Sequence, residues 1–167
     1  MRQLNLTRRG LLAVAAMALA GCGYRPLYGK TDANANVAAE LSEIAVAEQG
    51  ERAGQLVRNE LISTLGAGGS RYLLKLDVTE KTQAVSSVAK SVVDRHRYRL
   101  NVSYLLVAAG SGEEMASGKS FSNVSYDTVQ EPVADLQAAE NARERAAREL
   151  AQDLKIRLSA FFATRPS

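Results

Sequence analysis

The net charge of this chain is confined to its first residues. The 167 residues contain 21 lysines and arginines against 18 aspartates and glutamates, and residues 1–21 hold three of the arginines and no acid. Residues 22–167 are therefore formally neutral, so the sequence pI of about 9.1 is no evidence for nucleic-acid binding. This remainder has the size of one domain and is long enough to bury a hydrophobic core.

The N-terminus has the organisation of an export signal that ends in a lipobox. Basic residues precede the apolar run LLAVAAMALA at residues 11–20, which is too short for a bilayer core that needs about 20 residues. The small-residue sequence Leu19-Ala20-Gly21-Cys22 follows and contains the only cysteine. The pattern predicts a signal peptide at residues 1–21, its removal, and attachment of palmitate-type acyl chains to Cys22. The arginine pair at residues 8–9 either forms a twin-arginine signal or only supplies charge.

The rest of the chain has few residues of the types that carry out catalysis. Acylation of Cys22 leaves no thiol, and His96 is the only histidine, so Cys/His nucleophile pairs and zinc-type clusters are excluded. His96 lies on the apolar side of a predicted strand, which favours a core or edge histidine over a catalytic base. We therefore expect no enzyme, no metal and no cofactor. An anchored enzyme would instead require a pocket holding a group with a strongly perturbed pKa.

The first predicted elements after the leader are a tether, a strand and a helix. Residues 22–40 lack an apolar period and form the tether, which is either a linker or a docking segment carrying aromatic residues. Residues 41–47 predict a short strand. Residues 51–65 predict a helix, because apolar residues recur every four positions, and Gly66 stops it.

Three strands and a long helix follow. Residues 72–81 alternate as a half-buried strand, and residues 82–91 predict a loop or an irregular strand end. Residues 92–108 form the clearest strand, and the turn at residues 110–112 leads into a weaker strand at residues 115–126. A helix runs from Pro132 to about residue 162. Its predicted buried stripe is Leu136, Ala139, Ala146, Leu150, Leu154, Leu158 and Phe161.

The β-α-β-β-β-α order predicts one α+β domain over residues 41–164. The expected architecture is a two-layer sandwich, with a four-stranded mixed sheet and two helices on one face. The first strand can run parallel to a later one because a helix intervenes, and the last three strands form a meander.

One cluster of residues has the chemistry of a binding site. Arg95, Arg97 and Arg99 alternate along one strand and so point to one face, about 6.6–7 Å apart. Lys119 of the next strand, with Lys75 and Lys81, shares that face. Guanidinium groups bind phosphates or carboxylates through paired hydrogen bonds. The alternative is a solvated strand face with cross-strand partners such as Asp77 or Glu80.

These features together resemble the LptE family of lipopolysaccharide-assembly lipoproteins. The resemblance rests on the lipobox followed by CGYRPLYG at residues 22–29, the element order, and the RYRLNV strand at residues 97–102. The Ser125-Tyr126 pair before an Ala/Arg-rich terminal helix also fits. The resemblance covers nearly all of residues 22–167, although each motif apart from the lipobox is only moderately specific.

The resemblance implies a lipid-anchored protein on the periplasmic side of the cell outer membrane. Such a protein plugs the LptD-type β-barrel, assists its assembly, and supports lipopolysaccharide transport to the outer leaflet. Gly23 after the lipidated cysteine agrees with outer-membrane sorting. Lipopolysaccharide carries phosphates and carboxylates, which makes it the expected ligand of Arg95, Arg97, Arg99 and Lys119. The alternative is an auxiliary lipoprotein of an ABC-type lipid-transport system.

Overall fold

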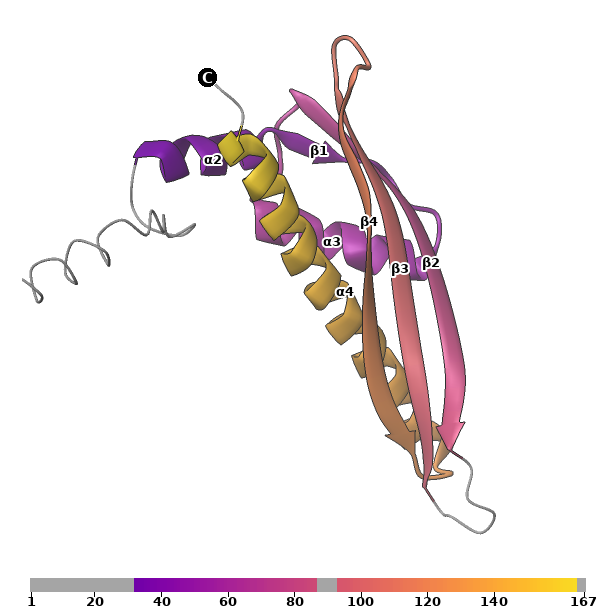
Figure 1. Cartoon of the computed structure of the whole chain (residues 1–167). Coiled ribbons are helices and arrows are strands. Elements are labelled where there is room, and N and C mark those ends of the chain that lie inside the picture. Colours follow the sequence, from indigo (N-terminus) through magenta and orange to yellow (C-terminus); the bar gives the residue numbers. More distant parts are fainter. Residues whose placement is uncertain (1–31, 87–92, 165–167) are drawn as a thin grey trace, which may run out of the picture. The chain divides into compact units, whose positions relative to one another are not determined.

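The computed structural model describes residues 32–86 and 93–164, which form a four-stranded sheet with three helices (Figure 1). The predicted α+β class with a mixed sheet is confirmed. The leader, Cys22 and the first part of the predicted tether lie outside the described residues. The elements in chain order are α2 (Asp32–Ser42), β1 (Ile44–Val46), α3 (Arg52–Leu65), β2 (Tyr72–Ser86), β3 (Asp94–Ala108), β4 (Glu114–Thr128) and α4 (Pro132–Thr164).

The strands lie in the sheet in their sequence order, β1-β2-β3-β4. The short β1 pairs parallel with the start of β2, because α3 carries the chain back between them. The other neighbours pair antiparallel, as predicted for a meander. Each of β2, β3 and β4 is 15 residues long, which corresponds to about 50 Å at a rise of about 3.3 Å per residue.

Two glycines make the turns that the sequence predicts. Gly66 ends α3 in the left-handed conformation with φ of 67°, and the next amide, of Ala67, donates to the Ile62 carbonyl at 3.0 Å. Gly112 has φ of 71° in the β3–β4 turn and donates its amide to the Ala108 carbonyl at 2.8 Å. A side chain at either position would be strained.

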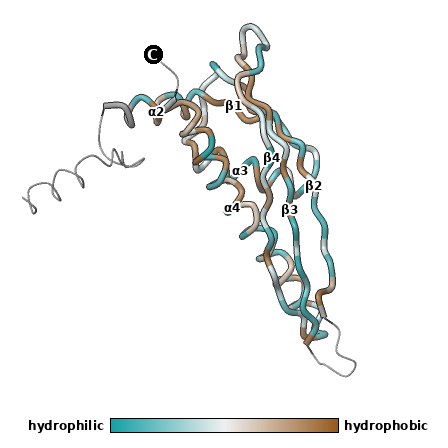
Figure 2. Tube along the Cα trace, viewed as in Figure 1, coloured by the Kyte–Doolittle hydropathy of each residue, from teal (hydrophilic) through white to brown (hydrophobic). Residues whose placement is uncertain are grey.

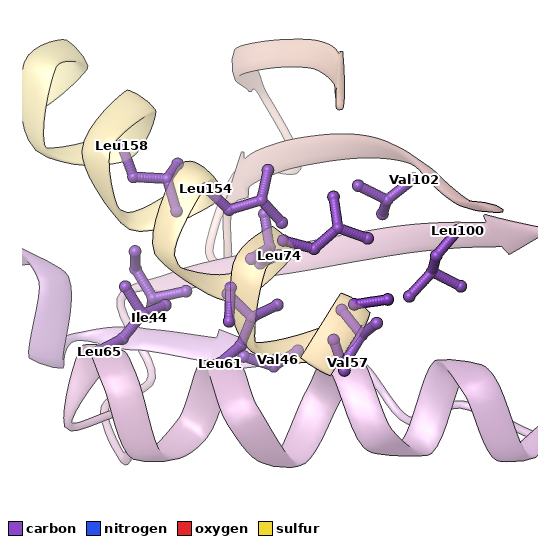
Figure 3. Packing of buried hydrophobic residues seen from close by; sticks show 14 of the residues in the cluster. Ile44, Val46, Val57, Leu61, Leu65, Leu74, Leu100, Val102, Leu154 and Leu158 are labelled. Carbon is purple, nitrogen blue, oxygen red and sulfur yellow. The ribbon is translucent and has the colours of Figure 1, made fainter. Parts of the chain in front are cut away.

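The core lies between the sheet and the two helices α3 and α4, which pack against the same face. Alternation along the strands sends every second residue to this face, and Figure 2 shows hydrophilic and hydrophobic residues following one another along them. Alanines on α4 let the helix approach the sheet closely, because Ala142, Ala146, Ala147 and Ala151 are fully buried. Figure 3 shows the larger side chains that interdigitate there: Ile44, Val46, Val57, Leu61, Leu65, Leu74, Leu100, Val102, Leu154 and Leu158.

The structure differs from the sequence prediction at the N-terminal side of the domain, and it decides between two alternatives at the end of one strand. Residues 32–42 form α2, although residues up to 40 were expected to be an unstructured tether and residues 41–42 a strand. The segment is rich in alanine, which favours helix without an apolar period. The strand β2 continues to Ser86 with an irregularity between Ala84 and Ser86, because β3 extends beside it and pairs with its backbone. Of the two alternatives for residues 82–91, the described part agrees with an irregular strand end.

The predicted buried stripe of α4 is confirmed in its middle, whereas Ala139 and Phe161 are only partly buried and Phe162, not Phe161, is the buried phenylalanine. Leu150, Leu154 and Leu158 are buried, whereas Leu136 is 66% exposed. Leu136 is in line with the stripe, but it lies in the first turns of α4, at the end of the sheet. No element of the described chain covers it there.

Candidate anion-binding face

The predicted cationic residues lie on the face of the sheet opposite the helices, called the outer face here. Backbone pairing places Lys81, Arg99 and Asn123 in one row across β2, β3 and β4, and Gln83, Arg97 and Ser125 in the next. Lys119 lies on the same face, opposite Ser103. The prediction that these cations share one face is therefore confirmed.

Arg95 is neutralised by a partner on the neighbouring strand. Its Nε and Nη2 donate to the two carboxylate oxygens of Asp127 at 2.8 and 3.1 Å. The hydrogen bond from Arg95 is the main reason that the pKa of Asp127 lies below its usual value. The sequence suggested Asp77 or Glu80 as partners of this face, and the actual partner of Arg95 is Asp127, directly opposite on β4.

Arg99 covers the exposed ring of Phe121. The guanidinium carbon lies 4.8 Å from the ring centroid, and the Arg99 Nε donates to the Asn101 side-chain oxygen at 3.0 Å. Phe121 is 58% exposed, although most large hydrophobic residues of the sheet face the helices. The two contacts position the guanidinium over the ring and use only its Nε, so its remaining N–H groups are available to an anion.

Arg97, between these two, is the free cation of β3. It is exposed and forms no hydrogen bond or ion pair with any part of the chain that the structure describes. Lys81 and Lys119 are likewise exposed and unpaired within residues 32–86 and 93–164. The outer face therefore offers Arg97, Arg99, Lys81 and Lys119 to an anionic ligand, whereas Arg95 is already engaged.

Glu80 lies on the opposite, helix-facing side of the sheet, where a polar network joins the two layers. Its carboxylate accepts a hydrogen bond from the Tyr98 hydroxyl at 2.6 Å and lies 3.5 Å from Arg143 of α4. Burial, followed by the hydrogen bond to Glu80, raises the pKa of Tyr98 far above its usual value. Arg143 also contacts Glu140, whose carboxylate pairs with Arg52 of α3. These residues orient the helices and are not available to a ligand on the outer face.

Two serines of β4 attach the sheet to α4. The Ser120 hydroxyl donates to Asp153 at 2.6 Å, and the Ser122 hydroxyl donates to Glu149 one turn earlier. Burial acts to raise the pKa of Asp153, but hydrogen bonds from Arg157 and Ser120 outweigh it and the pKa is lowered. Both serines are buried, so this polar seam stabilises the docking of α4.

His96 has the structural role that the sequence favoured. Its ring stacks on Tyr126 with centroids 5.3 Å apart, and its Nε2 lies 3.2 Å from the Thr128 hydroxyl.

A separate open hollow of about 270 Å³ lies beside α3 and is lined by polar side chains. One of them, Arg58, donates a hydrogen bond to the Val46 carbonyl. Among the described residues there is no metal-binding group of three or more His, Cys, Asp or Glu side chains. No described helix has the length and apolar character needed to cross a bilayer.

Phe121 and Asp127 are the outer-face residues that sequence reasoning did not identify. Both follow Lys119 at even spacing on β4, so the alternation that placed Lys119 on this face also places them there. The sequence does not show the pairing of Asp127 with Arg95, because the register between β3 and β4 depends on the turn and on a bulge near Leu106.

Comparison with known proteins agrees with this architecture. The family model described as "LptE: Lipopolysaccharide-assembly" matches residues 40–158. A structure described as a lipoprotein from Caulobacter crescentus CB15 has a TM-score of 0.70 and 28% identity, covering 78% of this chain and 98% of that one. A minor lipoprotein from Acinetobacter baumannii shares the fold, with a TM-score of 0.52 and 14% identity over 70% of this chain and 88% of that one.

A third similar structure is the uncharacterised lipoprotein B from Nitrosomonas europaea. It has a TM-score of 0.51 and 16% identity, covering 72% of this chain and 83% of that one. No curated protein matches this chain. The family model covers most of the chain, and together with the lipoprotein neighbours it supports a role in lipopolysaccharide assembly. The chain belongs to the LptE family of lipopolysaccharide-assembly lipoproteins.

Proposed function

We propose that this protein is a non-enzymatic outer-membrane lipoprotein that occupies the lumen of an LptD-type β-barrel. In this role it assists assembly of the barrel and supports lipopolysaccharide transport to the outer leaflet. The observation that carries the proposal is the match of residues 40–158, almost the whole described domain, to the LptE family.

The dimensions of the sheet support a position inside a barrel. Strands of 15 residues extend about 50 Å, which exceeds the thickness of about 40–45 Å for a bilayer with its headgroups. A large barrel encloses an aqueous lumen, and the outer face of this sheet is lined by polar and charged side chains. A domain of this length and polarity is suited to fill such a lumen rather than to contact lipid.

The outer face supports binding of lipopolysaccharide through its phosphates. Arg97 and Arg99 present planar guanidinium groups that can bind phosphate oxygens in pairs, and Lys81 and Lys119 add ammonium groups on the flanking strands. Arg95, which was nominated from the sequence, contributes only if the ligand displaces Asp127.

Attachment to the membrane is assigned to Cys22 within the lipobox. A single acyl chain gives only marginal membrane binding, so stable anchoring requires the two lipid groups that bacterial lipoproteins typically carry on this cysteine. Gly23 directly after it supports sorting to the outer membrane, with the domain on the periplasmic side.

Co-purification from fractionated membranes tests the proposal. The full chain is expected in the outer-membrane fraction in complex with a large β-barrel that resists mild detergent. The Cys22→Ala variant, which keeps the whole domain, is expected to lose membrane attachment. Recovery of wild-type protein only with inner-membrane transporter subunits would contradict the barrel assignment and support an auxiliary lipoprotein of an ABC-type system instead.

A further inference from the structure

Strand β4 forms one edge of the sheet, and the middle of this edge has no partner in the part of the chain that the structure describes (Figure 1). Alternate residues of an antiparallel strand direct their backbone N–H and C=O groups to opposite sides. The odd-numbered residues of β4 face away from β3, because the Ser125 carbonyl accepts a hydrogen bond from Arg145 of α4 at 3.3 Å. The residues whose outward backbone groups stay open are Lys119, Phe121 and Asn123.

Phe121 lies at the centre of this open stretch. Its side chain is 58% exposed and is the only aromatic one among the large exposed hydrophobic side chains of the described residues. Arg99 covers part of the ring, with its guanidinium carbon 4.8 Å from the ring centroid. An added strand would remove both the remaining ring surface and the open backbone groups from water, and these are the contacts through which strand addition stabilises a complex.

The other edge of the sheet is less suited to pairing with a further strand. β1 and the loop after it cover the start of β2, where the Leu76 carbonyl accepts a hydrogen bond from the Gln49 side chain at 3.3 Å. Charged side chains on an edge strand oppose edge-to-edge pairing, and the rest of β2 carries Asp77, Glu80 and Lys81. Residues 117–125 of β4 carry only the charge of Lys119, so the β4 edge is the less protected of the two.

The sequence of β4 is complementary to itself when two copies run antiparallel about a two-fold axis at Phe121. The two Phe121 rings then meet at the axis, where an aromatic pair contributes beyond the area that it buries. Like charges directly opposite each other would destabilise the pair, but every charged residue of β4 lies opposite an uncharged one. The opposite positions are Glu114 and Thr128, Met115 and Asp127, Ser117 and Ser125, and Lys119 and Asn123.

We propose that the chain forms a two-fold dimer in which the β4 edges of two copies pair around Phe121 into one continuous sheet. Pairing satisfies the open backbone groups in both copies and displaces the exposed hydrogen bond from Arg145 to the Ser125 carbonyl. The same patch meets itself across the axis, so the assembly closes at two copies and does not extend into a fibre. The inference goes beyond the proposed function, because it concerns the chain without a barrel partner.

Disulfide trapping of the register tests the proposal. Lys119→Cys and Asn123→Cys are each introduced into the full chain carrying Cys22→Ala, which has no other thiol. Lys119 of one copy lies opposite Asn123 of the other, with Cα atoms about 5.5 Å apart and within reach of a disulfide. The two copies of Lys119 are about 13 Å apart along the strands, beyond that reach, and so are the two copies of Asn123. A disulfide-linked dimer is therefore expected when the two variants are mixed and oxidised, and not from either variant alone.

A proline on each edge tests the pairing without a thiol. Asn123→Pro removes an N–H that faces away from β3, so proline is compatible with the fold but not with an added strand. The dimer loses this hydrogen bond in both copies, so its dissociation constant in sedimentation equilibrium should rise at least about tenfold. Thr82→Pro is the matched control, because the even-numbered residues of β2 face its open edge, as the Leu76 carbonyl does. This variant should dimerise like wild type.

Each outcome supports or overturns the dimer. Monomeric wild type, no disulfide in the mixture, or equal disulfide yields from the mixture and from each variant alone would contradict pairing about Phe121. An unchanged dissociation constant in Asn123→Pro would likewise overturn it, provided that circular dichroism shows a native fold, and disulfide trapping decides if that variant does not fold. Co-purification with a barrel is measured separately, so failure of the dimer leaves the proposed function untouched.

Discussion

Arg95 and Asp127 face each other directly across β3 and β4 and form a two-point ion pair on the outer face. Arg97, two residues further along the same strand, faces Ser125 and Gln83 and has no acidic partner among the described residues. Two arginines that are equivalent in the sequence pattern are therefore different in their capacity to bind an external anion.

Replacing Arg97 is expected to weaken binding of lipopolysaccharide. An exposed charge contact contributes up to about 1 kcal/mol, so the Arg97→Gln variant should bind about fivefold more weakly in low-salt buffer. Arg148→Gln removes the same charge from the exposed side of α4 and should bind like wild type. Equal losses in both variants would indicate a net-charge effect rather than a site, and no loss in Arg97→Gln would remove this residue from the ligand surface.

Replacing Asp127 is expected to have the opposite effect. The Asp127→Asn variant releases Arg95 from its partner and adds a free guanidinium beside Arg97, so the affinity for deacylated lipopolysaccharide should rise. Asp77→Asn is the control, because it removes one negative charge from the same face without releasing Arg95. If both variants gain the same affinity, or if Asp127→Asn gains none, Arg95 lies outside the binding surface.

Core packing predicts a large difference between two aliphatic residues of α4. Leu154 is fully buried, so Leu154→Ala should lower the free energy of unfolding by about 2–5 kcal/mol. Ile156 is 47% exposed, so Ile156→Ala should cost much less, within about 1 kcal/mol. Urea denaturation followed by circular dichroism measures both. Similar losses of unfolding free energy in the two variants would mean that the side of α4 carrying Leu154 does not pack against the core.

The ion pair between Arg52 and Glu140 predicts a pH dependence of stability. The hydrogen bond from Arg52 is the main cause that lowers the pKa of Glu140 in the folded protein. The unfolded chain therefore binds a proton at higher pH than the folded protein does. The stability from this pair is present above the usual carboxylate pKa of Glu140 and is lost as the pH falls through its lowered, folded-state pKa.

Denaturation between neutral pH and about pH 3 measures this effect. Glu140→Gln should be less stable than wild type at neutral pH and should lose less stability on acidification. Glu113→Gln, in the β3–β4 turn, is the control for the removal of one negative charge distant from Arg52. A wild-type slope in Glu140→Gln would show that the pair contributes no pH-dependent stability.

The sequence alone determined the fold class and most of its elements. Alternation along β2 and β3, the four-residue period of α3, and the glycines at positions 66 and 112 depend only on local geometry. The same alternation placed Arg95, Arg97, Arg99 and Lys119 on one face, because a strand sends successive side chains to opposite sides. Local rules did not predict α2, which lacks an apolar stripe. They left residues 82–91 open between a loop and an irregular strand end, because the end of β2 depends on a neighbouring strand.

Only the tertiary structure decided which of these residues are available to a ligand. Strand register pairs Arg95 with Asp127, turns Glu80 toward Tyr98 and Arg143, and leaves Arg97 free. The exposure of Leu136, which the helical period places in the buried stripe, likewise depends on where the sheet ends. Ion pairs and burial are set by residues distant in sequence, and the register that brings them together is fixed by the whole assembly of strands and helices.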